Sequence, residues 1–185
     1  MTQAQQQPAF VLPAALLSQG YALRRETDDD LPFLMRLFAS TRERELAPMP
    51  WSTEQKRDFL ASQFEAQSRH YRTFIAGGDY LLVEHHGAGA GRLYLDMRRT
   101  SLHIVDIALM PDWRGKGLGT AILEALQDFG RMRGMAIGIF VEKFNPALRL
   151  YRRLGFAEIA DHDVYLEMEW TPDALNPETP AAAYG

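Results

Sequence analysis

The chain has 185 residues, of which 46% are hydrophobic and 11% aromatic, and its formal net charge is −4. This length and apolar content predict one globular domain with an ample core rather than two domains. The absence of cysteine excludes disulfides, thiolate metal ligands and a cysteine nucleophile, and it suits a cytoplasmic protein. The best candidate for an N-terminal apolar run, residues 9–17, is short and contains Pro13, so we expect neither a signal peptide nor a membrane span.

Charge is unevenly distributed along the chain. Residues 91–155 contain eleven Lys and Arg against six Asp and Glu, whereas the remainder contains nine against eighteen. A basic region suits a polyanionic ligand and an acidic region attracts a cationic amine, but an uneven distribution without function accounts for these counts equally well. Because no basic helix face is expected beyond residues 91–155, we do not expect nucleic-acid binding.

Both ends of the chain lack a periodic apolar pattern. Residues 1–20 are rich in glutamine, and residues 171–185 contain three prolines. We therefore expect a flexible segment on either side of one domain at residues 21–170.

The first half of this domain reads as a strand followed by two helices. Tyr21 to Arg25 predict the strand, and Asp28 to Asp30 cap the first helix. A loop at 41–51 leads to a second, amphipathic helix at 52–70. The residues of these helices and of the loop that we expect to face the core are Leu31, Leu34, Met35, Phe38, Trp51, Phe59, Leu60 and Phe64.

The second half alternates strands and helices. Helix patterns start after the turn at 114–119 and at Asn145. The predicted order is strand, two helices, three strands, helix, strand, helix and two strands. The strand patterns lie at residues 73–84, 92–99, 102–109 and 137–141, with a final hairpin at 158–170.

The most informative stretch runs from Leu102 to Leu123, where an apolar strand leads through a short turn into a helix. The turn, residues 114–119, contains three glycines and two cations. Glycines let the backbone approach a ligand closely, and free N–H groups at a helix start attract phosphate. The spacing excludes a Walker loop, because Gly117 follows Lys116, and it excludes GxGxxG, because Thr120 stands at the third glycine position. We therefore expect a phosphate-binding turn of another kind.

A second segment, Gly138 to Ile159, carries a strand and a short helix. Asn145 is the expected N-cap, Pro146 takes the first helical position and Gly155 ends the helix. The apolar face of this helix is expected to hold Ala147, Leu150, Tyr151 and Leu154. The face toward solvent or a polyanion is expected to hold Arg149, Arg152 and Arg153.

The two motifs, Arg-x-x-Gly-x-Gly at 114–119 and Asn-Pro-Ala-x-x-x-Tyr-x-x-x-Gly-Phe at 145–156, resemble the signatures of the GNAT superfamily of acyl-CoA N-acyltransferases. The resemblance implies a mixed α/β fold with a central, mostly antiparallel, twisted sheet. That sheet would have about seven strands, splayed between strands 4 and 5, and about four flanking helices. It also implies acetyl-CoA as co-substrate.

The resemblance further implies how coenzyme A binds. The turn would hold the pyrophosphate, with Lys116 neutralising charge, and Arg152 or Arg153 would reach the 3′-phosphate. Asn145 would hold pantetheine, although helix capping alone explains an Asn-Pro pair. The implied binding residues are Ile107, Ala108, Leu109, Arg114, Gly115, Lys116, Gly117, Leu118, Gly119, Thr120, Asn145, Ala147, Tyr151 and Arg152.

The chemistry implied by the resemblance is direct attack of an amine on the acetyl thioester. A backbone N–H at a bulge in the fourth strand, at Leu109 or Met110, would stabilise the oxyanion. Tyr151 occupies the family's position for the acid that protonates the thiolate, and a phenol of pKa about 10 can donate to a thiolate of pKa about 8.5. The alternative for Tyr151 is a packing role alone.

A base is also needed, because a lysine-like amine is almost wholly protonated at neutral pH. His103 and Asp106 are the ionisable candidates in the fourth strand, and on a regular strand they lie on opposite faces. A bulge between them would reverse that parity. His103 resembles the place where some relatives keep a glutamate base, and for both residues a structural role is at least as well supported as catalysis.

The acceptor pocket implied by the resemblance lies near the first two helices and their loop. Glu43 or Glu45 would bind an ammonium group, or both would be solvated charges at the end of a helix. Either His70 or Tyr71 would line the cleft. His85 and His86 are two adjacent imidazoles without further ligands, and we expect no metal site.

The sequence therefore predicts an N-acetyltransferase that moves acetyl from acetyl-CoA to a primary amine. The acceptor would be a small molecule or a protein or peptide amine, and a homodimer is compatible with the resemblance. The alternative is an acyl-CoA-binding regulatory or sensing module with the same fold, because a fold does not imply an activity.

Overall fold

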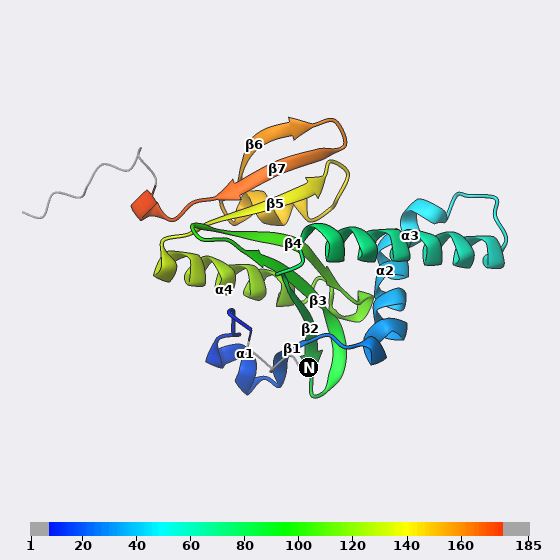
Figure 1. Cartoon of the computed structure of the whole chain (residues 1–185), viewed down its shortest axis with the longest axis horizontal. Helices are drawn as coiled ribbons and strands as arrows, with labels where there is room; N and C mark the ends of the chain where they lie inside the picture. Colours follow the sequence, from blue (N-terminus) through cyan, green and yellow to red (C-terminus); the bar gives the residue numbers. More distant parts are fainter. Residues whose placement is uncertain (1–7, 176–185) are drawn as a thin grey trace, which may run out of the picture.

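The computed structural model describes residues 8–175, which form one seven-stranded sheet and five α-helices (Figure 1). The predicted mixed α/β fold and element order are confirmed, with one helix added at the N-terminus. The strands are β1 (Tyr21–Arg25), β2 (Asp79–His85), β3 (Ala88–Met97), β4 (Ser101–Leu109), β5 (Ala136–Glu142), β6 (Ala157–His162) and β7 (Tyr165–Trp170). The α-helices are α1 (Ala14–Ser18), α2 (Leu31–Leu46), α3 (Thr53–Phe74), α4 (Leu118–Arg133) and α5 (Leu148–Arg153).

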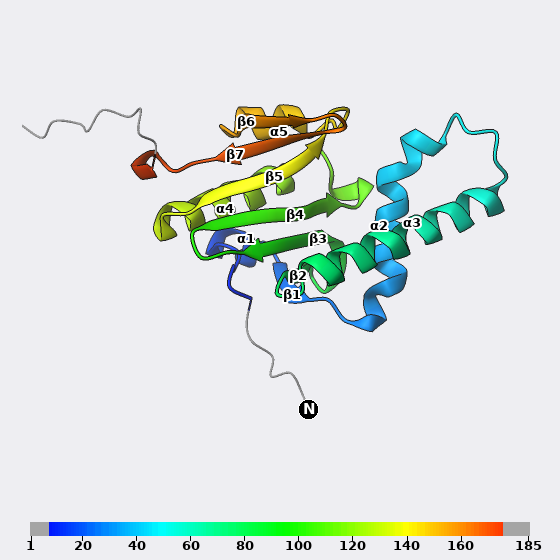
Figure 2. The same cartoon turned by 45° about the horizontal axis from the view of Figure 1, so that its top comes forward.

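The strand order in the sheet is β1-β2-β3-β4-β5-β7-β6. All neighbours are antiparallel except β4 and β5, which are parallel. Parallel pairing joins only Ser101–Ile104 to residues 136–139, and beyond it the two strands diverge (Figure 2). The predicted splay between the fourth and fifth strands is therefore present.

Helices cover both faces of the β1–β4 part of the sheet. α1 and α4 lie on one face, and α2 and α3 lie on the other (Figure 2). Because side chains of a strand alternate between faces, Leu81 and Val83 pack into the larger core with α4, whereas Leu82 packs with α2 and α3. Both faces of these strands are therefore buried.

The N-terminal segment differs from the expected flexible tail. Phe10, Leu12 and Leu16 are buried in the main core, and the Phe10 ring meets that of Phe129 edge-on with centroids 5.8 Å apart. The segment has no periodic apolar pattern, because it places single apolar side chains in the core rather than one face of a helix. Residues 1–7 and 176–185, also predicted to be flexible, lie outside the described residues.

The two-helix unit also differs in detail from the prediction. α2 continues to Leu46, so most of the expected loop at 41–51 is helical, and Ser52 then caps α3 through a capping box with Gln55. Phe64 is buried as predicted, whereas Leu31 and Trp51 are 51% and 37% exposed. Two helices that share one sheet face cannot bury every apolar residue that the periodic pattern suggests. The other predicted core residue that is exposed is Met35.

Candidate functional site

The gap between β4 and β5 is the central feature of the site. Beyond the pair Ile104 and Ile139, the residues of β4 pair only with β3 on their other side. Backbone groups of β4 that point toward β5 are therefore left without a strand partner there. Such groups can pair with an extended ligand inserted between the strands.

Leu109 presents its backbone N–H to this gap. The Met110 N–H donates to the Ala90 carbonyl at 2.9 Å, so Met110 is bonded to β3. In an antiparallel ladder, bonded and non-bonded residues alternate, so the backbone groups of Leu109 and Ile107 point away from β3 and toward the gap. Of the two candidates for an oxyanion donor, Met110 is therefore occupied, and Leu109 is open.

The bulge in β4 lies elsewhere than predicted. The register shifts between the pairs Ile104/Leu95 and Asp106/Tyr94, which makes Val105 the extra residue. The expected bulge at Leu109 or Met110 is thus wrong by four residues or more, because pairing with β3 is regular at that end of the strand. The Leu109 N–H faces the gap because β4 and β5 diverge. The bulge at Val105 instead changes which side chains of β4 share a face of the sheet.

The turn before α4 is exposed to solvent at residues 114–117. Gly115 and Gly117 have φ values of +70° and +88°, and a Cβ built at either position meets no atom within 4 Å. Gly117 is the N-cap of α4 and supplies no side-chain cap, so the first N–H groups of the helix, 118–120, have no helical acceptor. Backbone donors and the positive end of the helix dipole therefore meet beside the open space at these two glycines.

The two cations of the turn have different surroundings. Lys116 has no ion-pair partner among residues 8–175. The Arg114 guanidinium turns away, because it donates to the Leu109 carbonyl at 2.8 Å and to the Ser40 hydroxyl at 2.7 Å. Arg114 was expected to face an anion, but in this structure it ties the end of β4 to α2.

α5 and its preceding turn follow β5, the second strand of the gap, along the chain. The Asn145 side chain accepts from the Ala147 N–H at 2.9 Å, but α5 begins only at Leu148, so Asn145 caps a turn rather than the helix itself. Gly155 ends the helix at φ +83° as predicted. Arg152 pairs with Glu158 at 2.6 Å, so its guanidinium is already engaged.

Tyr151 is 4% exposed and packs against Phe156. Its hydroxyl has no hydrogen-bond partner in the described part of the chain. The hydroxyl oxygen is not fully shielded from solvent. Burial raises the pKa of Tyr151 well above its usual range, and the negative charge of Asp106 adds to the shift. The phenol is therefore protonated at neutral pH and free to donate.

On the α3 side of the gap, Asp106 is the centre of a polar network. It pairs with the buried Arg92 guanidinium and accepts from the Tyr71 hydroxyl at 3.2 Å. Arg92 also donates to Gln67 at 2.9 Å and lies 5.0 Å from the centre of the Tyr94 ring. Burial and then Asp106 raise the pKa of Tyr71, so its hydroxyl stays a donor.

His103 lies on the same sheet face as Asp106, because Val105 between them reverses the regular parity. Its ring is 5.3 Å from the Phe140 ring, over the still-paired part of β4 and β5. Burial and then Arg98 lower the pKa of His103, so the imidazole is neutral at pH 7. The structure thus separates the two base candidates along the strand.

Sequence reasoning missed several polar residues around the gap. Arg92 lies in a strand that also contains Asp96, and its pairing with Asp106 depends on the register of β3 and β4. Arg42 donates to Glu142 at 3.3 Å and to Glu45 at 3.0 Å, which joins α2 to the end of β5. Of the predicted pair at the end of α3, Tyr71 reaches the network, and His70 packs on Phe74.

The described residues contain no group of three or more His, Asp or Glu able to hold a metal ion. Between residues 8 and 175, no helix is both long and apolar enough to cross a membrane.

Comparison with known proteins identifies the family. Residues 33–156 match the acetyltransferase (GNAT) family, and the chain belongs to this family. The matched region includes both β4 with its turn and α5 with Tyr151.

Individual relatives agree with this assignment. Streptothricin acetyltransferase of Streptomyces lavendulae is 35% identical over 96 residues, which is 50% of this chain and 48% of that protein, so the match spans about half of each. The structure of the PaiA N-acetyltransferase of Thermoplasma acidophilum with coenzyme A is similar at a TM-score of 0.63 and 14% identity, over 82% of this chain and 99% of that one. The ribosomal-protein-S18-alanine N-acetyltransferase of Escherichia coli gives a TM-score of 0.51 and 22% identity, over 82% and 93%. These two structures share the fold.

Proposed function

We propose that the protein transfers an acetyl group from acetyl-CoA to a primary amine. The observation that carries the proposal is the combination of three features on β4, on the turn that follows it and on α5, the helix that follows β5. These are the open turn at 115–117, the gap-facing N–H of Leu109 and the unpartnered hydroxyl of Tyr151. The neighbour solved with coenzyme A supports this ligand.

The turn fits a pyrophosphate. A Cβ at Gly115 or Gly117 would fill space that is open here, and backbone N–H groups of 118–120 are available as donors. Lys116 would neutralise phosphate charge. Arg153, whose guanidinium is 3.5 Å from the Thr120 hydroxyl, is better placed than Arg152 to reach a further phosphate from the start of α4.

Acetyl-CoA, when bound, supplies an activated acyl group on a thiolate leaving group. The Leu109 N–H would donate to the carbonyl oxygen as negative charge develops there. Tyr151 would donate its proton to the departing sulfur, because its hydroxyl has no other hydrogen-bond partner among the described residues. The first group belongs to β4 and the second to α5, the helix that follows β5.

Asp106 is the better placed of the two ionisable residues to act on the amine. A strand advances roughly 3.3 Å per residue, so Asp106 is about 10 Å along the backbone from Leu109 and His103 is about 20 Å away. Asp106 is already held by Arg92 and Tyr71, so we assign it an electrostatic role in attracting and orienting the ammonium. The ammonium would lose one proton to water before the neutral amine attacks, and the proton released from the nitrogen after attack would restore the Tyr151 phenol. His103 is too distant to accept the proton directly.

The first test is isothermal titration of the purified protein with acetyl-CoA, with 3′-dephospho-CoA and ATP as controls. Selective binding of acetyl-CoA supports the proposed cradle. Thiol release with a panel of amines, including streptothricin, lysine peptides and polyamines, then tests transfer. Binding without acceptor-dependent thiol release would contradict the enzyme and favour an acyl-CoA-sensing module.

A further inference from the structure

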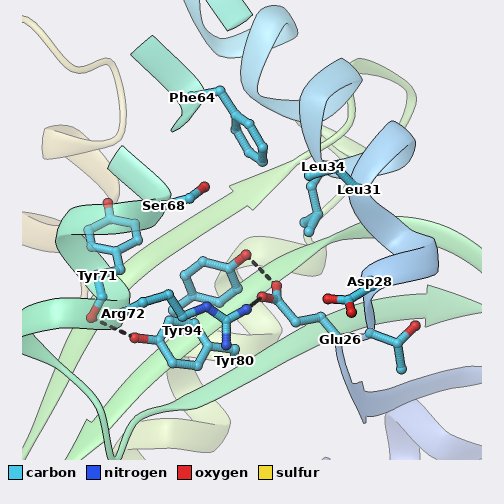
Figure 3. Close-up of a pocket in the computed structure, with 11 residues that line it drawn as sticks. Glu26, Asp28, Leu31, Leu34, Phe64, Ser68, Tyr71, Arg72, Tyr80 and Tyr94 are labelled. Atoms are coloured by element: carbon cyan, nitrogen blue, oxygen red, sulfur yellow. Dashed lines mark hydrogen bonds and ion pairs between the residues drawn. The ribbon is translucent and has the colours of Figure 1, made fainter. Parts of the chain in front are cut away.

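A pocket of about 220 Å³ lies beneath α2 and α3, on the sheet face that carries Tyr80 and Tyr94 (Figure 3). Apolar side chains from the two helices, Leu34 and Phe64, form one wall. Glu26, which follows β1, points into it from the sheet (Figure 3). This pocket combines an apolar wall, aromatic faces and a carboxylate.

Glu26 is nearly buried, with its side chain only 7% exposed. It accepts from the Tyr94 hydroxyl at 2.5 Å and pairs with the Arg72 guanidinium. Burial raises the pKa of Tyr94, so this hydroxyl remains a donor. A carboxylate withdrawn from water in this way requires a cation beside it.

Arg72 supplies that cation from outside. Its side chain is 59% exposed, yet its guanidinium lies 4.2 Å from the centre of the Tyr80 ring and pairs with Glu26. The Tyr80 hydroxyl donates to the Tyr71 and Ile75 carbonyls, which fixes the ring as a platform. A long, solvent-exposed side chain therefore lays its charged end on an aromatic and carboxylate site that would suit a free ligand equally well.

The pocket carries a net negative charge even with Arg72 in place, so it favours a cation over a neutral or anionic ligand. Its charged lining residues are Glu26, Asp28 and Arg72, which sum to one negative charge. Asp28 is exposed at the rim and has no ion-pair partner among the described residues. A ligand with one positive group and a short apolar part would match both the charge and the wall.

We propose that this pocket binds a small organic cation, an alkylguanidinium or alkylammonium ion, which takes the place of Arg72 on Glu26 and Tyr80. The inference goes beyond the transfer reaction and does not depend on it. The residues that line this pocket do not include Asp106, Leu109 or Tyr151, so we place its occupant apart from the β4–β5 gap. Tyr71 lies between the two, because it lines the pocket and donates to Asp106.

The test is calorimetric titration with n-butylguanidinium, in the absence of acetyl-CoA, with the neutral isostere n-butylurea as control. We expect the cation to bind and n-butylurea not to bind. Arg72→Ala removes the internal occupant, so its affinity for n-butylguanidinium should rise about tenfold. The same variant should melt at a lower temperature than the wild type, and the cation should restore its Tm.

Two further variants act as controls. Glu26→Gln should abolish binding, and Arg57→Ala, which removes an exposed cation of α3 paired with Glu54 and Asp58, should leave it unchanged. The proposal is overturned if folded Arg72→Ala binds n-butylguanidinium no more tightly than the wild type, or if n-butylurea restores its Tm equally. If Glu26→Gln does not fold, the comparison of the two ligands on Arg72→Ala still decides.

Discussion

The two walls of the β4–β5 gap are built from different kinds of chemical group. On the α4 wall, the donors are backbone N–H groups, that of Leu109, left open by the splay, and those of 118–120 at the start of α4, next to the glycines of the turn. On the α3 wall, the polar groups are side chains of a buried network centred on Asp106. The first wall depends on local backbone conformation and the second on which strands lie side by side, so substitutions should affect them differently.

Tyr151→Phe should have the largest effect on turnover. Loss of the proton donor to the thiolate is expected to lower kcat by about 10²- to 10⁴-fold, while acetyl-CoA affinity is nearly unchanged. Steady-state kinetics and titration calorimetry measure the two quantities separately. Full activity of the variant would mean that Tyr151 only packs against its neighbours.

Arg92→Met tests the side-chain wall. It leaves Asp106 without its cation in a largely buried site, and we expect a loss of about 3–5 kcal/mol in the free energy of unfolding. Urea denaturation measures the loss, and Arg131→Ala, which breaks the exposed pair with Asp128, provides the control. Adding Asp106→Asn to the first variant should recover part of the stability. Equal effects of Arg92→Met and the control would contradict the network.

Gly117→Ala tests the backbone wall. The residue has φ +88° and an added Cβ meets no protein atom, so the cost to folding is the left-handed conformation alone, about 1–2 kcal/mol. The methyl group would occupy the ligand side of the turn, and acetyl-CoA affinity should fall about tenfold. Gly87→Ala in the β2–β3 hairpin, at φ +79° with equally open space, is the matched control. It should lose similar stability but no affinity, and an equal loss of affinity in both variants would refute the assignment of the turn.

Lys116→Ala should have a smaller effect. An exposed cation beside a phosphate contributes roughly 0.5–1 kcal/mol, so acetyl-CoA affinity should fall about threefold and its salt dependence should weaken. Lys56→Ala, which removes a partly exposed lysine of α3, is the control. An unchanged affinity and salt dependence would show that backbone groups alone hold the anion.

The pH dependence of kcat on the alkaline side should be flat. Burial raises the pKa of Tyr151 above its ordinary value of about 10, so the phenol stays protonated, and kcat should not decline up to about pH 10. A pH profile of kcat at saturating substrate measures this. A decline centred near pH 8 that disappears in Tyr151→Phe would show that the phenol ionises early.

The sequence by itself determined the order of elements and the backbone wall. The turn at 114–119 and the end of α5 at Gly155 are local features, in which the missing Cβ or the positive φ is encoded by the residue itself. The alternation of apolar residues likewise predicted the strands, because a period of two fixes which side chains face a core. Spacing along the chain is sufficient for such features.

Only the tertiary structure decided the side-chain wall and the partners of individual charges. The bulge at Val105 places His103 and Asp106 on one face, and the pairing of β3 with β4 brings Arg92 to Asp106. Arg114 turns to Ser40 and away from the turn because α2 packs there. The aperiodic residues 8–20 enter the core for the same reason, since burial and pairing depend on neighbours distant in sequence, which no local pattern records.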